Sequence, residues 1–179
     1  MAYHHLAIAT RDLEASHRFY TEAMGFTLVK TSVAPTPGDT GWARHLFYDT
    51  GNGEMFALWD LHDDALPADF SPAISTGLGL PSWVNHVAFD GGSLEELAQK
   101  RDRWLACGHD VVEIDHGWCT SIYLDDPNGI AVECCCTTRS FTPADAADAE
   151  DLRRAAAPPL QEPALPEVYE ALGVTAGAQ

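Results

Sequence analysis

The sequence predicts an α+β fold in which two βαβββ modules follow one another along the chain, with an acidic C-terminal extension after them. Two observations lead to this prediction. The segment His5-Leu6-Ala7-Ile8 recurs in the second half of the chain as His86-Val87-Ala88-Phe89. Each copy reads as a short apolar strand, followed by a helix-start signal and then by three strand-like stretches. We therefore expect one domain over residues 1–139 and an arm over residues 140–179.

The first module is expected over residues 3–60. After the strand that begins at His5, the pattern predicts a helix from Asp12 to about Met24. Three strands should follow, at Phe26–Val33, Trp42–Asp49 and Glu54–Asp60, with Thr50-Gly51-Asn52-Gly53 as the turn before the last. Residues 61–82 contain Pro67, Pro72 and Pro81, so they should form the linker between the modules.

The second module is expected over residues 83–137. Ser93 and Glu96 form a capping box that starts a helix, and Gly108 follows its expected end near Ala106. Strands are then predicted at Asp110–Ile114, Thr120–Asp125 and Ile130–Cys136, with Asp126-Pro127-Asn128-Gly129 as the turn before the last. The two modules therefore share one order of elements.

The arm differs in composition, because prolines, alanines and acidic residues dominate it. Short helices are predicted around Ala144–Ala156 and Pro166–Leu172. A packed surface arm is favoured over a partly disordered one, because the arm offers apolar anchors at Leu160, Leu165, Val168, Tyr169 and Leu172.

The charge balance restricts the partners. The net charge is −17 with histidine neutral and the sequence pI is about 4.5, which argues against nucleic acid and anionic membrane surfaces as ligands. No apolar run reaches the length of a membrane span, and the N-terminus shows no leader pattern. The five cysteines are odd in number, and the run Cys134-Cys135-Cys136 points to alternating faces of a strand. We therefore expect a reducing, cytoplasmic compartment.

Strand alternation brings three possible metal ligands to comparable positions. His5, His86 and Glu133 each fall on the strand face that does not pack under a helix. Two imidazoles and one carboxylate can hold a divalent transition metal on one face of an octahedron and leave positions open for a substrate. The alternative is that each histidine is a structural residue with satisfied hydrogen bonds. The repeated position of the two histidines favours the metal site.

Residues 3–137 resemble the vicinal oxygen chelate superfamily, which includes glyoxalase I, bleomycin-resistance and fosfomycin-resistance proteins and type I extradiol dioxygenases. The resemblance rests on the following segments: His5-Leu6-Ala7-Ile8 with Asp12-Leu13, Phe19-Tyr20 with Met24-Gly25-Phe26, Asn85-His86-Val87-Ala88-Phe89, Ser121-Ile122-Tyr123, Asp126-Pro127-Asn128-Gly129 and Val132-Glu133. It implies two modules placed edge to edge as a curved mixed sheet around a metal cleft. It also implies ligands from the first and fourth strands, which here are His5, His86 and Glu133.

The fourth ligand position of the superfamily is altered in this chain. Aligning the two modules places Ala57 where Glu133 lies in the second one, whereas glyoxalase-type lyases carry a polar ligand there. The remaining three-ligand set resembles that of the extradiol dioxygenases, although fosfomycin-resistance enzymes also use two histidines and a glutamate.

Further residues resemble those of the extradiol enzymes. His116-Gly117 precedes Tyr123, and a hairpin should return Tyr123 beside Glu133, where a phenol and an imidazole could hydrogen-bond a bound phenolate. The extradiol histidine expected near Gly53 is missing, and His45 is the candidate to replace it. The cleft wall should include Phe47, Met55, Trp59 and Ser121.

The resulting functional prediction is a metal-dependent oxygenase, extradiol-like, that acts on a small catechol-like or phenolic substrate. Fe(II) is the expected metal and Mn(II) the next, with O₂ as co-substrate. No phosphate loop or dinucleotide fingerprint occurs, so no nucleotide or organic cofactor is expected. Two alternatives stay open: another metal enzyme of the superfamily (lyase, epimerase or thiol transferase), and a ligand-sequestering protein without turnover. A homodimer also stays open.

Overall fold

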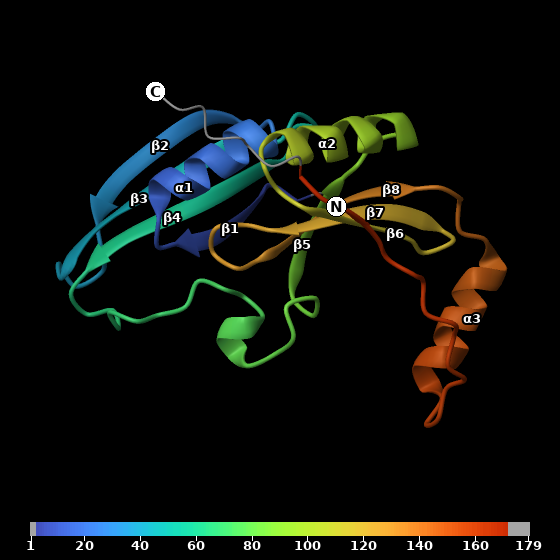
Figure 1. Cartoon of the computed structure of the whole chain (residues 1–179). Coiled ribbons are helices and arrows are strands. Elements are labelled where there is room, and N and C mark those ends of the chain that lie inside the picture. The colour runs from blue at the N-terminus through green and yellow to red at the C-terminus, as the bar shows by residue number, and fades with distance from the viewer. Residues whose placement is uncertain (1–2, 172–179) are drawn as a thin grey trace.

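The computed structural model describes residues 3–171 and contains two mixed β-sheets with helices packed against them (Figure 1). In the first module the elements are β1 (His5–Thr10), α1 (Leu13–Arg18), the π-helical turn η1 (Phe19–Ala23), β2 (Thr27–Pro35), β3 (Gly41–Asp49) and β4 (Met55–Asp63). After the 3₁₀ turn η2 (Thr76–Leu78) come β5 (His86–Asp90), α2 (Leu94–Ala106), β6 (Val111–Asp115), β7 (Cys119–Asp125) and β8 (Ala131–Thr137), then α3 (Pro143–Arg154) and β9 (Glu167–Tyr169). This order confirms the predicted α+β fold of two βαβββ modules.

Each module forms its own sheet. The first has the strand order β1-β4-β3-β2 and the second the order β5-β8-β7-β6-β9. In both, the first strand pairs parallel with the fourth, and the remaining pairs are antiparallel. The first strand of each module, β1 or β5, is therefore the edge strand of its sheet.

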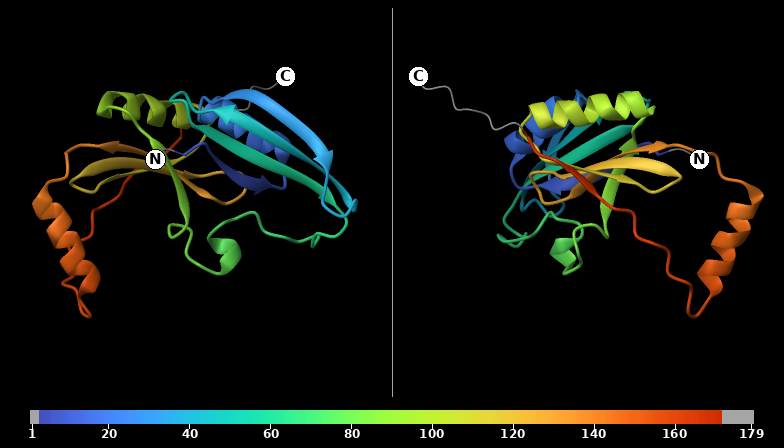
Figure 2. Two further views of the ribbon diagram at one scale, coloured as in Figure 1. Left: turned by 180° about the vertical axis from the view of Figure 1, so that it is seen from behind. Right: turned by 45° about the vertical axis from the view of Figure 1, so that its right-hand side comes forward.

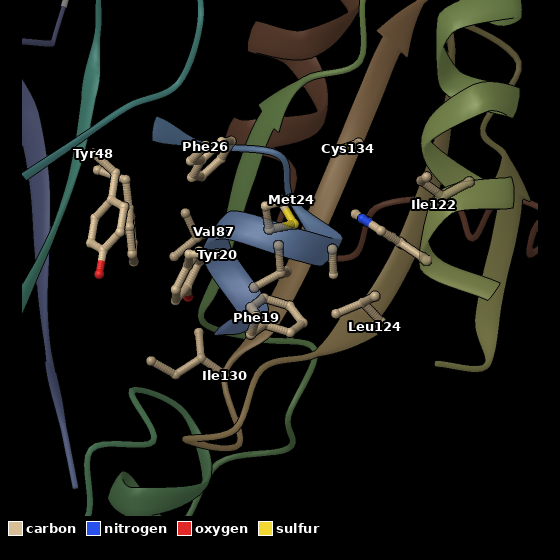
Figure 3. Packing of buried hydrophobic residues seen from close by; sticks show 14 of the residues in the cluster. Phe19, Tyr20, Met24, Phe26, Tyr48, Val87, Ile122, Leu124, Ile130 and Cys134 are labelled. Atoms are coloured by element: carbon tan, nitrogen blue, oxygen red, sulfur yellow. The ribbon is translucent and has the colours of Figure 1, made fainter. Parts of the chain in front are cut away.

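One hydrophobic core joins the modules. Figure 3 shows Phe19, Tyr20 and Met24 of the α1–η1 segment lying between Tyr48 of the first sheet and Ile122 of the second. All five are buried. The residues of this core alternate along the strands with the residues of the opposite sheet faces, as the period of two in a strand requires. The faces turned away from the helices are therefore left for other contacts.

A buried polar network also connects the modules. The Tyr20 hydroxyl donates to Asp126 Oδ2 at 2.9 Å, and the Asn128 side-chain amide donates to Ser16 Oγ at 3.1 Å. Asp126 Oδ1 accepts the backbone N–H of Ile130 at 2.9 Å. The expected turn between β7 and β8 is thus held against the first module's helical segment by satisfied buried groups.

Two expectations, one about the first helix and one about the linker, differ in detail from the structure. The helix expected over Asp12 to Met24 is α-helical only to Arg18, and it then widens into a π turn. The Thr21 hydroxyl donates to the His17 carbonyl there, a local bond that competes with the regular helix ladder. The linker begins later than residue 61, because β4 extends to Asp63.

The C-terminal arm is partly as expected. The first predicted helix is present as α3, with a capping box formed by Thr142 and Asp145. The second prediction, a helix around Pro166–Leu172, is wrong, since Glu167–Tyr169 form the strand β9; the predicted anchor Leu172 lies outside the described residues. Leu160 and Leu165 are not anchors, because they are 98% and 85% exposed.

Within residues 3–171, no helix has the length and apolar character needed to cross a bilayer.

Candidate functional site

Four side chains of the second sheet form one hydrogen-bonded row. His86 Nε2 lies 3.1 Å from Glu133 Oε2. The Tyr123 hydroxyl donates to Glu133 Oε1 at 3.1 Å, and His116 Nε2 lies 3.0 Å from the same hydroxyl. Because the Tyr123 proton goes to the carboxylate, the hydroxyl accepts from the His116 N–H. The row runs from β5 through β8 to β7 and the loop before it.

The sheet register produces this row. Tyr123 stands opposite Glu133 in the antiparallel β7–β8 pair, and Ala88 stands opposite Glu133 in the parallel β5–β8 pair. Directly opposed residues share a face of the sheet. The neighbours Ile122 and Val132 consequently point into the core, where both are fully buried. The predicted placement of Tyr123 beside Glu133 is confirmed.

The tautomer of His86 follows from its second contact. His86 Nδ1 lies 3.1 Å from the Trp83 carbonyl oxygen, and a carbonyl only accepts, so Nδ1 carries a proton. In a neutral ring Nε2 then presents its lone pair to Glu133, whose side chain is only 8% exposed. Two acceptors at this distance need a proton or a cation between them. The arrangement is the one that a histidine and a carboxylate adopt as metal ligands, with the far nitrogen bonded to a carbonyl.

Burial controls the protonation of Tyr123. Loss of solvent, together with the nearby Glu133 carboxylate and against a lowering by a hydrogen bond with Ser121, raises the pKa of the Tyr123 phenol to about 12. The phenol is therefore neutral at physiological pH. It acts as a hydrogen-bond donor on the open side of Glu133.

The first sheet carries a different cluster. His45 stacks on Trp59 with ring centroids 3.7 Å apart, and its ring lies 4.1 Å from that of Phe47 and 6.0 Å from that of His5. His5 Nδ1 lies 2.8 Å from His4 Nδ1. Burial lowers the pKa of His45, and the neighbouring His5 lowers it further. His45 Nε2 is buried and has no hydrogen-bond partner among the described residues.

Each sheet has its own hollow. The second-sheet hollow has a volume of about 660 Å³, and its lining includes Trp83, His86, Val112, Ile114, His116 and Tyr123. The first-sheet hollow has a volume of about 490 Å³, and its lining includes Ala9, Ser32, Ala43, His45, Trp59 and Leu61. The two hollows share no lining residue. Two halves of the expected site are thus present on separate sheets.

The structure brings together two of the three side chains predicted as ligands. His86 and Glu133 lie side by side, whereas His5 lies in the aromatic cluster of the first sheet. Across residues 3–171 no three histidine, cysteine or acidic side chains come close enough to hold a metal ion. The ligand roles of His5, His86 and Glu133 therefore stay a prediction.

The altered fourth position lies where the alignment predicted. Ala57 stands opposite Phe47 and Ala7, as Glu133 stands opposite Tyr123 and Ala88. Ala57 is completely buried. Its methyl group offers no ligand, so the first sheet contributes no counterpart to Glu133.

The remaining predicted wall residues lie in several places. Trp59 lines the first-sheet hollow, and Met55 lines a third pocket of about 420 Å³ beside β1 and β5. Ser121 is fully buried, with its hydroxyl 3.9 Å from Cys119 Sγ. The sequence analysis missed Trp83 and Val112, although strand alternation in β6 could have found Val112.

Comparison with known proteins places this fold. The family model of the glyoxalase/bleomycin resistance protein/dioxygenase superfamily matches residues 2–134. A glyoxylase/bleomycin resistance protein/dioxygenase domain from Frankia sp. EAN1pec is 20% identical with a TM-score of 0.59, over 79% of this chain and 95% of that one. The fosfomycin resistance protein FosX from Listeria monocytogenes is 17% identical with a TM-score of 0.51, over 81% and 97% of the two chains.

A variant of that FosX protein was solved with Mn(II) and 1S,2S-dihydroxypropylphosphonic acid; it is 18% identical, with a TM-score of 0.52, over 78% of this chain and 94% of that one. No curated protein matches the chain. At these identities the solved structures establish the fold. The family model covers most of the chain, and the chain belongs to the glyoxalase/bleomycin resistance protein/dioxygenase superfamily, also called the vicinal oxygen chelate superfamily.

Proposed function

We propose that the chain is a divalent-metal-dependent enzyme whose site is completed by a second copy. His86 and Glu133 of one copy and His5 of the other would be the ligands. The observation that carries this proposal is the contact between His86 Nε2 and Glu133 Oε2, 3.1 Å apart, with the far imidazole nitrogen 3.1 Å from a carbonyl oxygen. A cation between them would satisfy both, and a second imidazole would complete a facial set of three.

The second copy is inferred from the edges of the two sheets. β1, which carries His5, and β5, which carries His86, are both edge strands with unpaired backbone groups on one side. Tyr3, Leu6 and Trp83 lie along or next to them and are large exposed apolar residues. Pairing β1 of one copy with β5 of another would bury this surface and bring His5 towards His86.

Mixing two inactive variants tests this assembly. His5→Ala and Glu133→Ala should each lose stoichiometric Fe(II) or Mn(II) binding. When they are unfolded together and refolded as a mixture, about one quarter of the sites should recover binding, because a mixed dimer has one site with both ligands intact. The matched control mixes His86→Ala with Glu133→Ala, which damage the same half-site and should recover nothing. Equal behaviour of both mixtures, or full metal binding by either single variant, would contradict the proposal.

The reaction we propose is oxygenation of a small catechol-like or phenolic substrate. When bound, Fe(II), with Mn(II) as the next choice, would polarise two adjacent substrate oxygens and support O₂ chemistry. The chain's own residues supply the rest. The neutral Tyr123 phenol donates a hydrogen bond to Glu133, and His116 orients that phenol. The candidate base, His45, lines the first-sheet hollow and would therefore come from the second copy.

The second-sheet hollow suits such a substrate. Val112 and Ile114 provide an apolar wall, and Trp83 provides an aromatic surface beside His86. The volume of about 660 Å³ accommodates a substituted aromatic ring. His116 and Tyr123, which are hydrogen-bonded to each other, would receive the oxygens of such a ring.

Oxygen dependence separates this reaction from its alternatives. The chain, loaded anaerobically with Fe(II), should consume O₂ with a panel of catechols and hydroxylated quinones, and it should lose activity on oxidation and recover it with a reductant. A lyase, epimerase or thiol transferase would turn over under nitrogen with Mg(II), Ni(II) or Zn(II). A sequestering protein would bind its ligand without forming a product. Turnover that is unchanged under strict anaerobic conditions would exclude the oxygenase.

A further inference from the structure

The C-terminal arm adds a strand to the second sheet that the first sheet does not have. β9 pairs antiparallel with β6 and becomes the fifth, outer strand, with Val168 opposite Val112 and Tyr169 opposite Val111. In the first sheet the equivalent of β6 is β2, which is the edge strand. Figure 2 (right) shows the chain after α3 returning as an extended segment towards this sheet.

The two neighbouring side chains of β9 point to opposite faces of the sheet. Tyr169 packs against the core on the helix side, where the Arg101 guanidinium of α2 lies 4.3 Å from its ring centroid. Val168 must therefore lie on the other face, next to its partner Val112. Val112 lines the second-sheet hollow. Val168 is thus the next side chain outward from the lining residue Val112 on the face that bears the hollow.

Side chains of the domain hold β9 in place. Arg101 Nη1 donates to Glu113 Oε2 at 2.9 Å while its guanidinium covers Tyr169. The backbone N–H of Ala171 donates to Asp110 Oδ1 at 2.8 Å. In the segment just before β9, Leu160 and Leu165 are almost fully exposed and so do not anchor the chain to the domain. The contacts of this strand, rather than of the arm as a whole, fix its position.

We propose that Val168 is a specificity-determining residue that forms the outer wall of the second-sheet hollow, and that the Arg101–Tyr169 stack is the latch that holds it there. The ligand it selects is the apolar end of an aromatic compound whose polar end faces Tyr123 and His116. This inference rests on the proposed function only in assigning the hollow to the substrate. The wall itself is defined by the sheet register.

Binding of the neutral, apolar dye Nile red tests the wall without metal or turnover. Val112→Asp places a charge in the lining of the second-sheet hollow and serves as the reference. The dye fluorescence that is present in the wild type and absent in Val112→Asp is taken as binding in this hollow. For this binding, Val168→Asp should weaken affinity about tenfold, since it places a charge where the dye would otherwise cover an apolar side chain. Val33→Asp is the matched control, because Val33 is also a valine on an outer strand and is 63% exposed against 62% for Val168. It should leave dye affinity unchanged.

Variants of Tyr169 test separately whether the Arg101–Tyr169 stack holds Val168 in place. Tyr169→Ala should weaken dye binding as much as deletion of residues 166–179, whereas Tyr169→Phe keeps the ring under Arg101 and should retain binding. Unchanged affinity in both Val168→Asp and the deletion variant would overturn the proposal, as would an equal loss in Val33→Asp. Glu133→Ala should lose metal and keep dye affinity, so failure of the metal site and failure of the wall give different results.

Discussion

Tyr123 and Glu133 stand directly opposite each other in the β7–β8 ladder, and the phenol donates to the carboxylate at 3.1 Å. The carboxylate's other oxygen faces His86 Nε2. One carboxylate thus connects a neutral phenol on one side with an imidazole on the other. The hydroxyl lies next to Glu133, the carboxylate that we propose as a metal ligand.

Removing this hydroxyl should affect turnover more than folding. Tyr123→Phe deletes one donor and almost no volume, so the free energy of unfolding should change by only about 1 kcal/mol. If the hydroxyl stabilises charge that develops in the reaction, kcat should fall by a factor on the order of 10²–10³. Metal content, measured on the same samples, should stay at the wild-type level. A loss of metal together with activity would show that Tyr123 positions Glu133 instead.

The residue next to it should behave in the opposite way. Ile122 is fully buried in the shared core, so Ile122→Asn removes apolar contacts and buries an unpaired amide. We expect the free energy of unfolding to drop by about 3–5 kcal/mol in urea titrations. Ile122→Val is the conservative comparison and should cost about 1 kcal/mol. A wild-type unfolding midpoint in Ile122→Asn would mean that the assignment of faces in β7 is wrong.

The alternation of faces was predictable from the sequence because it depends only on local periodicity. Aligning the modules on their turns placed Phe47 opposite Ala57 and Tyr123 opposite Glu133, and both pairs are present in the ladders. Once the turn fixes the hairpin register, the period of two in a strand leaves no freedom. The same logic accounts for Ile122, the neighbour of Tyr123, which lies in the core.

The parts that failed depend on contacts between distant segments. The relative placement of the two sheets is set by shared packing and by Tyr20 and Asn128 reaching across the modules, which no local pattern encodes. The strand β9 depends on an open edge of β6 and on Arg101 above Tyr169, so tertiary contacts overrode the helical pattern. The position of His5 relative to Glu133 also depends on how the two sheets pack together, so the local sequence pattern could not predict it.

The junction between modules should be sensitive to Asp126. Its carboxylate is buried and accepts from the Tyr20 hydroxyl, the Asn128 side chain and the Ile130 backbone. Asp126→Ala leaves these donors unpaired, so the free energy of unfolding should fall by about 3 kcal/mol. Tyr20→Phe removes a single bond and should cost about 1 kcal/mol. Urea titrations of the two variants measure this, and a smaller loss in Asp126→Ala than in Tyr20→Phe would contradict the network.

His109 should contribute to the loss of folding stability at acidic pH. Burial lowers the pKa of this imidazole below its ordinary value of 6.5, and its ring lies against that of Phe19 at 5.4 Å. Between the lowered pKa and 6.5 the unfolded chain binds a proton that the folded chain does not, so stability is present above pH 6.5 and is lost as the pH falls through this window. His109→Phe keeps a ring against Phe19 and removes the titration. Its free energy of unfolding should therefore fall less than that of the wild type between pH 7.5 and pH 5. His45, whose pKa is also lowered, keeps part of the slope, and an identical slope in His109→Phe and wild type would refute the assignment.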